Sequence, residues 1–130
     1  MYKNEFMTHT YATHRQIIYW IKNGAMIGKR NGIGSGHNID YSMLDAQICN
    51  VLYELHSLMG SRESGQLVTN NLTMQLKNRP DFMQENDILF IGQYGNIAEN
   101  FEIQGYVIDL VQIEKKMRRG AKNASNAVNG

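Results

Sequence analysis

The stretch THRQIIYWIKNGAM, residues 13–26, decides how the first half of the chain can fold. Thr13 belongs to the residue types that cap helix N-termini, and Asn23-Gly24 can end a helix because glycine tolerates a left-handed conformation. Three isoleucines between these ends recur at the spacing of one helix face: Ile17, Ile18 and Ile21. The stretch therefore predicts a short helix, and this helix carries the chain's single tryptophan, Trp20.

A basic, glycine-rich segment and a long amphipathic helix follow. Residues 28–36 contain four glycines together with Lys29 and Arg30, a composition that excludes regular helix and favours a hairpin-like loop. Tyr41-Ser42 closes the loop, and Ser42 can cap the next helix. Apolar residues over 43–59 then recur at steps of three and four and predict one apolar stripe: Leu44, Ile48, Val51, Leu52, Leu55, Leu58 and Met59.

The second half of the chain predicts a helix, a small β element and a closing helix. Residues 66–78 form an amphipathic pattern that ends before Pro80, because the residue before a proline disfavours helix. Three short apolar segments separated by turn residues predict strands at 88–91, 97–101 and 106–108. Residues 109–119 predict a last helix that buries Leu110, Ile113 and Met117, and residues 120–130 are expected to be a disordered tail.

The order of features in the first half resembles the winged helix-turn-helix DNA-binding domain of the MerR superfamily, in particular its short phage and bacterial members. The resemblance covers about residues 2–59. It rests on the following positions: Thr13, Arg15, Tyr19, Trp20, Gly24, the GSG at 34–36, Tyr41, Ser42 and Asp45. It implies that the helix opened by Thr13 recognises DNA and that the glycine-rich hairpin acts as its wing.

Two positions depart from the family's pattern. Ile18 stands where members usually carry a basic residue before the aromatic pair, and Asn38-Ile39-Asp40 stands where the wing usually ends with an arginine. Asp40 would repel phosphates, and phosphate contacts supply much of the affinity of such proteins for DNA. The departures imply weak binding, a different docking pose, or compensation by Lys29, Arg30 and the basic C-terminal segment.

The distribution of charge points in the same direction, although the net charge is only +1. Residues 1–39 contain five basic residues and one acidic residue, whereas residues 81–114 contain seven acidic residues and neither lysine nor arginine. Residues 115–122 are basic again. Such asymmetry is typical of chains whose basic side contacts nucleic acid.

Ten residues on the predicted helix and wing have the chemistry needed to contact double-stranded DNA. Arg15 matches the acceptors of guanine and Gln16 matches adenine, while Tyr19 can offer its hydroxyl to a phosphate. A helix N-terminus favours a phosphate, and a glycine-rich wing permits close approach to a groove. The candidate DNA-binding residues are Thr13, His14, Arg15, Gln16, Tyr19, Lys22, Lys29, Arg30, His37 and Tyr41.

Several of the same residue types have structural explanations. We expect Trp20 to be a core residue rather than a base contact, and Cys49 to be a small core residue. His14 and His37 have no second ligand at helical spacing, so no metal site is expected. The basic run 115–122 has two open interpretations, a contact to DNA or a helix C-terminus that complements its own dipole.

Composition excludes several other classes. No apolar run approaches the roughly 20 residues of a membrane span, and no secretion signal precedes the first helix. A single cysteine fits a reducing compartment, so a cytoplasmic protein is expected. We find no convergent His/Asp/Ser set and no phosphate-loop motif, so neither a catalytic activity nor a cofactor is expected.

The sequence thus predicts an α+β protein with three segments. Residues 1–60 would form a winged helix-turn-helix domain, residues 61–119 a small α/β subdomain for assembly or partner contact, and residues 120–130 the tail. The predicted function is double-stranded DNA binding by a small transcriptional regulator, with a homodimer or a protein partner engaged through residues 61–119. The alternative is a protein-interaction module, such as a phage assembly or DNA-packaging adaptor built on a winged helix.

Overall fold

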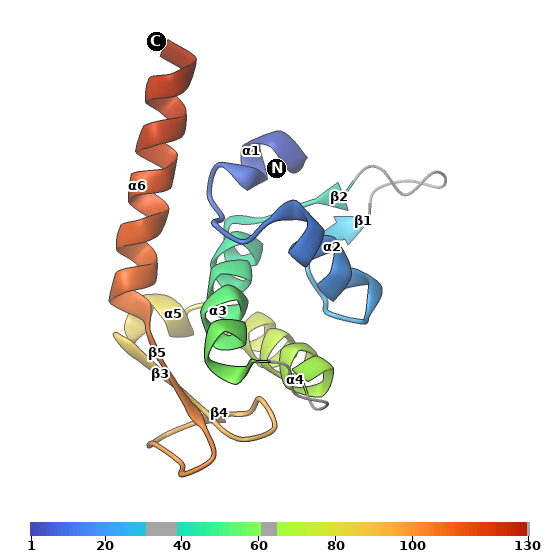
Figure 1. The fold of residues 1–130 in the computed structure, drawn as a ribbon, viewed down its shortest axis with the longest axis vertical. Helices are drawn as coiled ribbons and strands as arrows, with labels where there is room; N and C mark the ends of the chain where they lie inside the picture. Colours follow the sequence, from blue (N-terminus) through green and yellow to red (C-terminus); the bar gives the residue numbers. More distant parts are fainter. Residues whose placement is uncertain (31–38, 61–64, 130) are drawn as a thin grey trace.

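The computed structural model describes residues 1–30, 39–60 and 65–129, with side chains up to Arg119, and it has an α+β fold (Figure 1). The first half contains α1 (Lys3–Met7), α2 (His14–Lys22), β1 (Lys29–Arg30), β2 (Ile39–Asp40) and α3 (Met43–Met59). The second half contains α4 (Gly65–Asn78), α5 (Phe82–Glu85), β3 (Ile88–Ile91), β4 (Ile97–Ala98), β5 (Tyr106–Asp109) and α6 (Leu110–Asn129). The α+β class expected from the sequence is confirmed.

Helix α3 lies at the centre of the molecule, and elements from both halves pack against it. Its apolar stripe is buried at Ile48, Val51, Leu52 and Leu55, whereas Leu58 at its end is exposed. Helices α1, α4 and α6 and strand β5 all contact α3, and Figure 1 shows these elements arranged around it. The buried apolar residues from Phe6 to Ile113 form one cluster, so the predicted segments 1–60 and 61–119 both contribute to the same hydrophobic core.

The two helix starts predicted from Thr13 and Ser42 are confirmed. Each residue accepts a hydrogen bond from the backbone N–H three residues later, at 3.1 Å in both helices. The side chains of Gln16 and Asp45 accept hydrogen bonds from the cap backbone in return, which completes a capping box on each helix. Such a cap typically stabilises a helix by about 1 kcal/mol, so the starts of α2 and α3 are fixed locally.

The C-terminal β element is an antiparallel sheet with the strand order β4-β3-β5. Its inner face buries Leu89 and Ile91 of β3 and Tyr106 and Ile108 of β5. Strand β4 has two residues, Ile97–Ala98, where a strand to Phe101 was expected. The short helix α5 was not expected from the sequence, because its four residues are too few to show a helical period.

Helix α6 is longer than the sequence indicated. It continues from Leu110 to Asn129 through the segment that we expected to be a disordered tail, and its C-terminal end extends beyond the body of the molecule in Figure 1. Leu110 and Ile113 are buried and Met117 is half-buried, as expected for the inward face of the helix. None of the described helices combines the length and apolar character that crossing a membrane requires.

Candidate nucleic-acid interface

Helix α2 has one buried face and one polar, cationic face. Ile17 and Trp20 point into the core, and the indole of Trp20 stacks on the His56 ring of α3 with 5.4 Å between ring centroids. Trp20 is therefore a core residue, as predicted. Arg15, Tyr19 and Lys22 follow one another at steps of four and three residues and are all exposed, Tyr19 by 61%. The geometry thus places a guanidinium, a phenol and an ammonium on one side of α2.

Gln16 belongs to the cap of α2 rather than to its outer face. Its carboxamide oxygen accepts hydrogen bonds from the backbone N–H of Thr13 at 2.9 Å and from the Thr13 hydroxyl at 3.2 Å. A bidentate contact to adenine would need that oxygen, so the role predicted for Gln16 would require the cap to open. Thr13 shares in the same cap, which leaves the N–H groups of His14 and Arg15 for an external acceptor at the helix start.

Lys3, which is not among the ten candidate contacts, lies near the start of α2. Burial lowers the pKa of His14 below its usual 6.5, and the positive charge of Lys3 on α1 lowers it further. Lys3 is exposed, so it adds a cation to the side of the molecule on which α2 begins. The basic balance of residues 1–39 already included Lys3, but only the tertiary structure brings its charge close enough to His14 to lower the pKa of that residue.

Strands β1 and β2 form the base of the hairpin that was predicted from the glycine-rich segment. Lys29 pairs with Asp40 and Arg30 pairs with Ile39 in an antiparallel register, and both cations are exposed. Cross-strand neighbours lie about 5 Å apart, so Asp40 reduces the local positive charge at Lys29. Asp40 also forms an ion pair with the α-ammonium of Met1 at 2.6 Å. His37 and the GSG at 34–36 lie outside the described residues.

Tyr41 is a structural residue, which corrects its expected place among the DNA contacts. It is only 3% exposed, and its ring stacks on Phe6 of α1 with 3.9 Å between centroids and an interplanar angle of 10°. Burial raises the pKa of its phenol. Gly28 has a φ of +73° and packs closely against the same ring. A Cβ at this position would lie 3.1 Å from the Tyr41 ring and 2.5 Å from the Ile39 side chain, so a larger residue would not fit. Tyr41 therefore anchors the base of the hairpin to the core.

The connection between α1 and α2 is held by buried polar contacts to α3. The carboxamide of Asn50, which is fully buried, accepts a hydrogen bond from the Tyr11 N–H at 3.0 Å and donates one to the His9 carbonyl at 3.0 Å. The Tyr11 hydroxyl donates to Glu54 at 3.1 Å. Because both anchors are on α3, the start of α2 is fixed to the centre of the molecule by directional bonds.

Two ionisable residues of α3, Cys49 and Asp45, are buried in the core. Cys49 is buried, and burial raises the pKa of its thiol, so it stays protonated and unreactive near neutral pH. Asp45 is also buried. Its Oδ2 belongs to the cap of α3, whereas its Oδ1 lies 2.6 Å from Lys77 Nζ of α4. This contact is an ion pair without the alignment of a hydrogen bond. Among the described residues, no three His, Cys, Asp or Glu side chains come together as a metal site would require.

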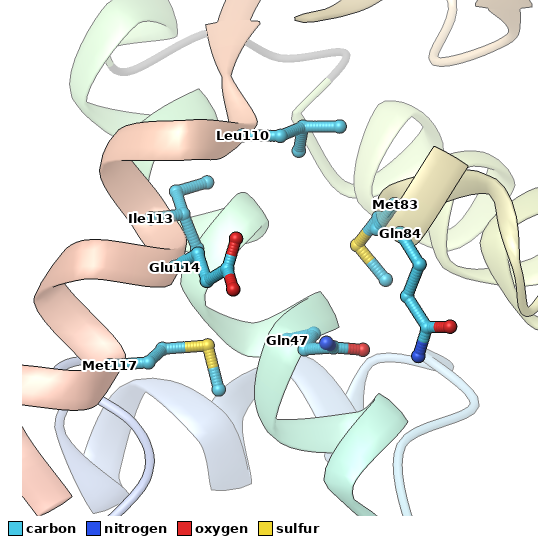
Figure 2. Close-up of a pocket in the computed structure, with 7 residues that line it drawn as sticks. All are labelled: Gln47, Met83, Gln84, Leu110, Ile113, Glu114 and Met117. Atoms are coloured by element: carbon cyan, nitrogen blue, oxygen red, sulfur yellow. The ribbon is translucent and has the colours of Figure 1, made fainter. Parts of the chain in front are cut away.

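A pocket of about 320 Å³ lies between α3, α5 and α6, apart from the elements of the candidate interface (Figure 2). Its lining combines apolar side chains with two carboxamides and a carboxylate: Leu110, Ile113, Met83, Met117, Gln47, Gln84 and Glu114. Glu114 forms an ion pair with Arg118. No pattern in the sequence indicated this pocket, because one wall is the short helix α5.

Comparisons of the chain with models of protein families, with functionally characterised proteins and with solved structures find no match.

Proposed function

We propose that the protein binds double-stranded DNA as a small transcriptional regulator, through a winged helix-turn-helix surface made of α2 and the β1–β2 hairpin. The observation that carries the proposal is the outer face of α2, where Arg15, Tyr19 and Lys22 are exposed opposite the buried Ile17 and Trp20. A rigid helix with a cationic, aromatic outer face has the width and the chemistry to enter a major groove.

Each exposed residue has a role in the proposed complex. Arg15, in the first turn of α2, reaches base edges and prefers guanine, whereas Tyr19 and Lys22 contact phosphates along the groove. The N–H groups of His14 and Arg15 donate to a backbone phosphate at the helix N-terminus. Lys29 and Arg30 on β1 contact the neighbouring backbone. Gln16 and Tyr41 are omitted from the contact set because they serve the cap and the core.

The resemblance to the MerR superfamily supports this docking pose. The chain order of α2, hairpin and α3 is the order that the resemblance implies, and α2 and α3 begin at the capping residues Thr13 and Ser42. The contact between Met1 and Asp40 reduces the repulsion that a carboxylate on the hairpin would exert on phosphate. Ile18 is the other departure from the family's pattern, and its side chain is half-buried. The positive charges on the exposed face of α2 are those of Arg15 and Lys22.

A titration of a random-sequence duplex at about 50 and 200 mM salt tests the proposal. Protein that contacts several phosphates should bind at the lower concentration and lose affinity steeply at the higher one, because bound cations are released on complex formation. Selection from random duplexes and footprinting would then identify the preferred site. Absence of salt-dependent binding to any duplex would contradict the proposal.

The second candidate function is a protein-interaction module, such as a phage assembly or DNA-packaging adaptor. The outer face of the C-terminal sheet favours it, because this face is apolar where an antiparallel sheet usually presents polar residues to water. Ile88 is 47% exposed and Val107 42%, on either side of the half-buried Phe90. The same surface would serve a DNA-binding regulator that forms a homodimer or holds a protein partner through residues 61–119.

Light scattering of the purified chain separates these uses of the sheet. A dimer that becomes monomeric on Val107→Lys would support self-association, while salt-dependent DNA binding retained by that variant would show that the two surfaces act independently. A monomer with no affinity for DNA leaves the adaptor as the better interpretation.

A further inference from the structure

We propose that the outer edge of strand β5 binds an extended, basic segment of a partner protein, which adds to the three-stranded C-terminal sheet as a fourth strand. This inference is independent of DNA binding and names the chemistry of a partner for the C-terminal half of the chain. Three observations carry it, namely the direction of the β5 backbone groups, a groove along this edge, and the charge of its surroundings.

Strand β5 is the longer of the two edge strands of the C-terminal sheet. The strand order is β4-β3-β5, and no other strand of the described chain pairs with the outer edge of β5, the side away from β3. β5 has four residues, Tyr106–Asp109, whereas the opposite edge strand β4 has two. The edge of a sheet presents backbone N–H and C=O groups that can pair with another extended chain. β5 therefore offers the larger backbone surface to a partner.

The hydrogen bonding between β3 and β5 shows which backbone groups of β5 point toward its outer edge. At the end of the two strands, the Leu110 N–H donates to the Asp87 carbonyl at 2.9 Å, so these residues form a hydrogen-bonded pair of the ladder. Hydrogen-bonded and non-hydrogen-bonded pairs alternate along antiparallel strands. The backbone groups of Ile108 therefore point toward β3, and those of Val107 and Asp109 point toward the outer edge.

A groove of about 340 Å³ lies at this edge. Three consecutive residues of β5 line it, Val107, Ile108 and Asp109, so the groove opens onto the backbone of the strand rather than onto one face of the sheet. The rest of its lining comes from α3 and α6: Glu54, Ser57, Leu58, Gln112 and Lys116. Leu58 is 55% exposed, although it belongs to the apolar stripe of α3. A strand paired with β5 would place alternate side chains on the α3 side of the sheet, beside Leu58.

The charge around the groove favours a basic segment over a second copy of this chain. Residues 81–114, which include all three strands of the sheet, contain seven acidic residues and neither lysine nor arginine. Two copies joined through β5 would bring these acidic segments together, and like charges across an interface cost free energy. Lys116 also lines the groove, but it is paired with Glu54 at 2.7 Å. Asp109 is therefore the uncompensated charge of the lining.

The proposed occupant is an extended segment in which apolar and basic residues alternate. Its backbone accepts hydrogen bonds from the N–H groups of Val107 and Asp109 and donates one to the Val107 carbonyl. Apolar side chains on one face pack beside Leu58, and lysine or arginine side chains on the other face lie near Asp109. The backbone pairing supplies affinity, and the alternating side chains supply specificity.

The test is a titration of the full chain with a synthetic peptide of about six residues in which valine and lysine alternate. Strand addition should shift the backbone amide NMR signals of Val107 and Asp109, because these groups gain hydrogen bonds, and should leave Ile108, which is bonded to β3, nearly unchanged. Equal shifts at all three amides, as expected for docking on side chains alone, would overturn the proposal. So would the absence of shifts up to about 1 mM peptide.

Two variants at Val107 separate the contribution of the backbone from that of the side chain. Val107→Pro removes one outward N–H, which a sheet tolerates only at an edge, and should weaken peptide binding roughly tenfold. Val107→Thr keeps the N–H and the β-branched shape and should bind within about threefold of the parent chain. Equal affinities of the two variants would contradict strand addition. Far-ultraviolet circular dichroism establishes that each variant is folded, and the shift pattern of the parent chain does not depend on either.

The charge preference is tested with a second peptide that has glutamate in place of lysine. The lysine peptide should bind more tightly at about 0.05 M salt, and its advantage should decrease at about 0.5 M salt because exposed charges are screened. Asp109→Asn, which keeps a side chain able to cap α6, should reduce the advantage. Glu85→Gln removes one charge from α5, outside the lining of the groove, and should retain it. Equal preferences in the two variants would overturn the assignment of a basic partner.

The same measurements separate this inference from a dimer and from the proposed function. Shifts of the Val107 and Asp109 amides that depend on protein concentration without peptide would mean that a second copy occupies the edge, and they would overturn the proposal. Failure of the chain to bind DNA would contradict the function proposed for α2 and leave the peptide titration unaffected.

Discussion

The outer face of α2 and the outer face of the C-terminal sheet are both exposed to solvent, but their chemistry is opposite. The first presents Arg15, Tyr19 and Lys22, whereas the second presents Ile88 and Val107 with Asp109 beside them. Both surfaces are supported by the same core, because α2 stacks on His56 of α3 and β5 packs against α3. The net charge of +1 therefore averages a basic surface and an acidic, apolar one.

This difference shows how one small core can support two surfaces of opposite chemistry. A helix exposes a narrow stripe on which long cationic side chains extend from a rigid support, which suits the phosphates of a groove. A small sheet exposes a flat face on which β-branched and aromatic side chains stand side by side, which suits another protein. The predictions below test whether the two surfaces and their shared core behave as separate functions.

The largest expected effect is on stability, and it compares Trp20 on the buried face of α2 with its neighbour Tyr19 on the exposed face. Trp20→Ala should lower the free energy of unfolding by about 3–5 kcal/mol, because it opens a cavity between α2 and His56. Tyr19→Ala should change it by no more than about 0.5 kcal/mol, since the ring is exposed. Urea unfolding of both variants measures the difference, and similar losses of stability would mean that α2 is oriented differently.

The next effect tests whether the two halves share one core. Lys77→Met leaves the buried Asp45 carboxylate without its partner on α4 and should cost about 2–3 kcal/mol, less than the roughly 3–5 kcal/mol typical of a fully buried pair, because Lys77 is partly exposed. Arg118→Met breaks the exposed pair with Glu114 and should cost about 0–1 kcal/mol. Thermal unfolding should remain a single transition in both variants, and two separate transitions would contradict a common core.

A smaller effect separates base reading from phosphate binding within the proposed interface. Arg15→Ala should reduce discrimination between the selected duplex and a random one by about 1–3 kcal/mol, because alanine cannot reach the base edge. Lys29→Ala should weaken binding to all duplexes alike and reduce the salt slope by about 1. Competition titrations give both quantities, and equal, sequence-independent decreases in affinity would contradict the assigned roles.

The smallest effect concerns the histidine that connects α2, α3 and α4. The Thr69 hydroxyl donates to the Gly65 carbonyl, so it accepts the 2.8 Å bond from His56 Nε2, which fixes the neutral tautomer. Burial lowers the pKa of His56 below 6.5. As the pH falls below about 6.5, this histidine therefore becomes protonated in the unfolded chain before it does so in the folded protein. The free energy of unfolding decreases over the pH range between 6.5 and the lower pKa of the folded state.

His56→Gln measures this contribution, because glutamine can still donate to Thr69 but does not titrate. Urea unfolding about one pH unit above and one below the ordinary histidine pKa should show a smaller decrease for the variant than for the parent chain. His14, whose pKa is also lowered by burial and by Lys3, leaves a residual decrease of the same sign in both proteins. An identical pH dependence in parent and variant would assign the effect to other groups.

Local signals in the sequence predicted most of the helices and the two caps. Thr13 and Ser42 cap their helices because the contact is made within three residues of the same chain. The burial of Trp20 also followed from its type and position. Strand β4 and helix α5 were predicted poorly or missed, because two to four residues carry too little periodicity for a pattern to be read.

The candidate site was predictable only in part, for a similar reason. Residue type indicated Arg15, Tyr19 and Lys22, and a helical period of about 3.6 residues was enough to place them on one face. It could not show that Gln16 completes a cap or that Tyr41 stacks on Phe6, since a tyrosine can serve a surface or a core equally well. Nor could it bring Lys3 or Lys116 to the start of α2.

The amino-acid order alone determined where most helices begin and end, which residues face inward, and how acidic and basic residues are divided along the chain. Those properties depend on contacts between near neighbours and on side-chain polarity. The tertiary structure decided that both halves share α3, that Tyr41 is buried and that Lys116 lies beside Tyr11. These outcomes depend on contacts between residues 35 to 105 positions apart, whose geometry exists only when the whole core has packed.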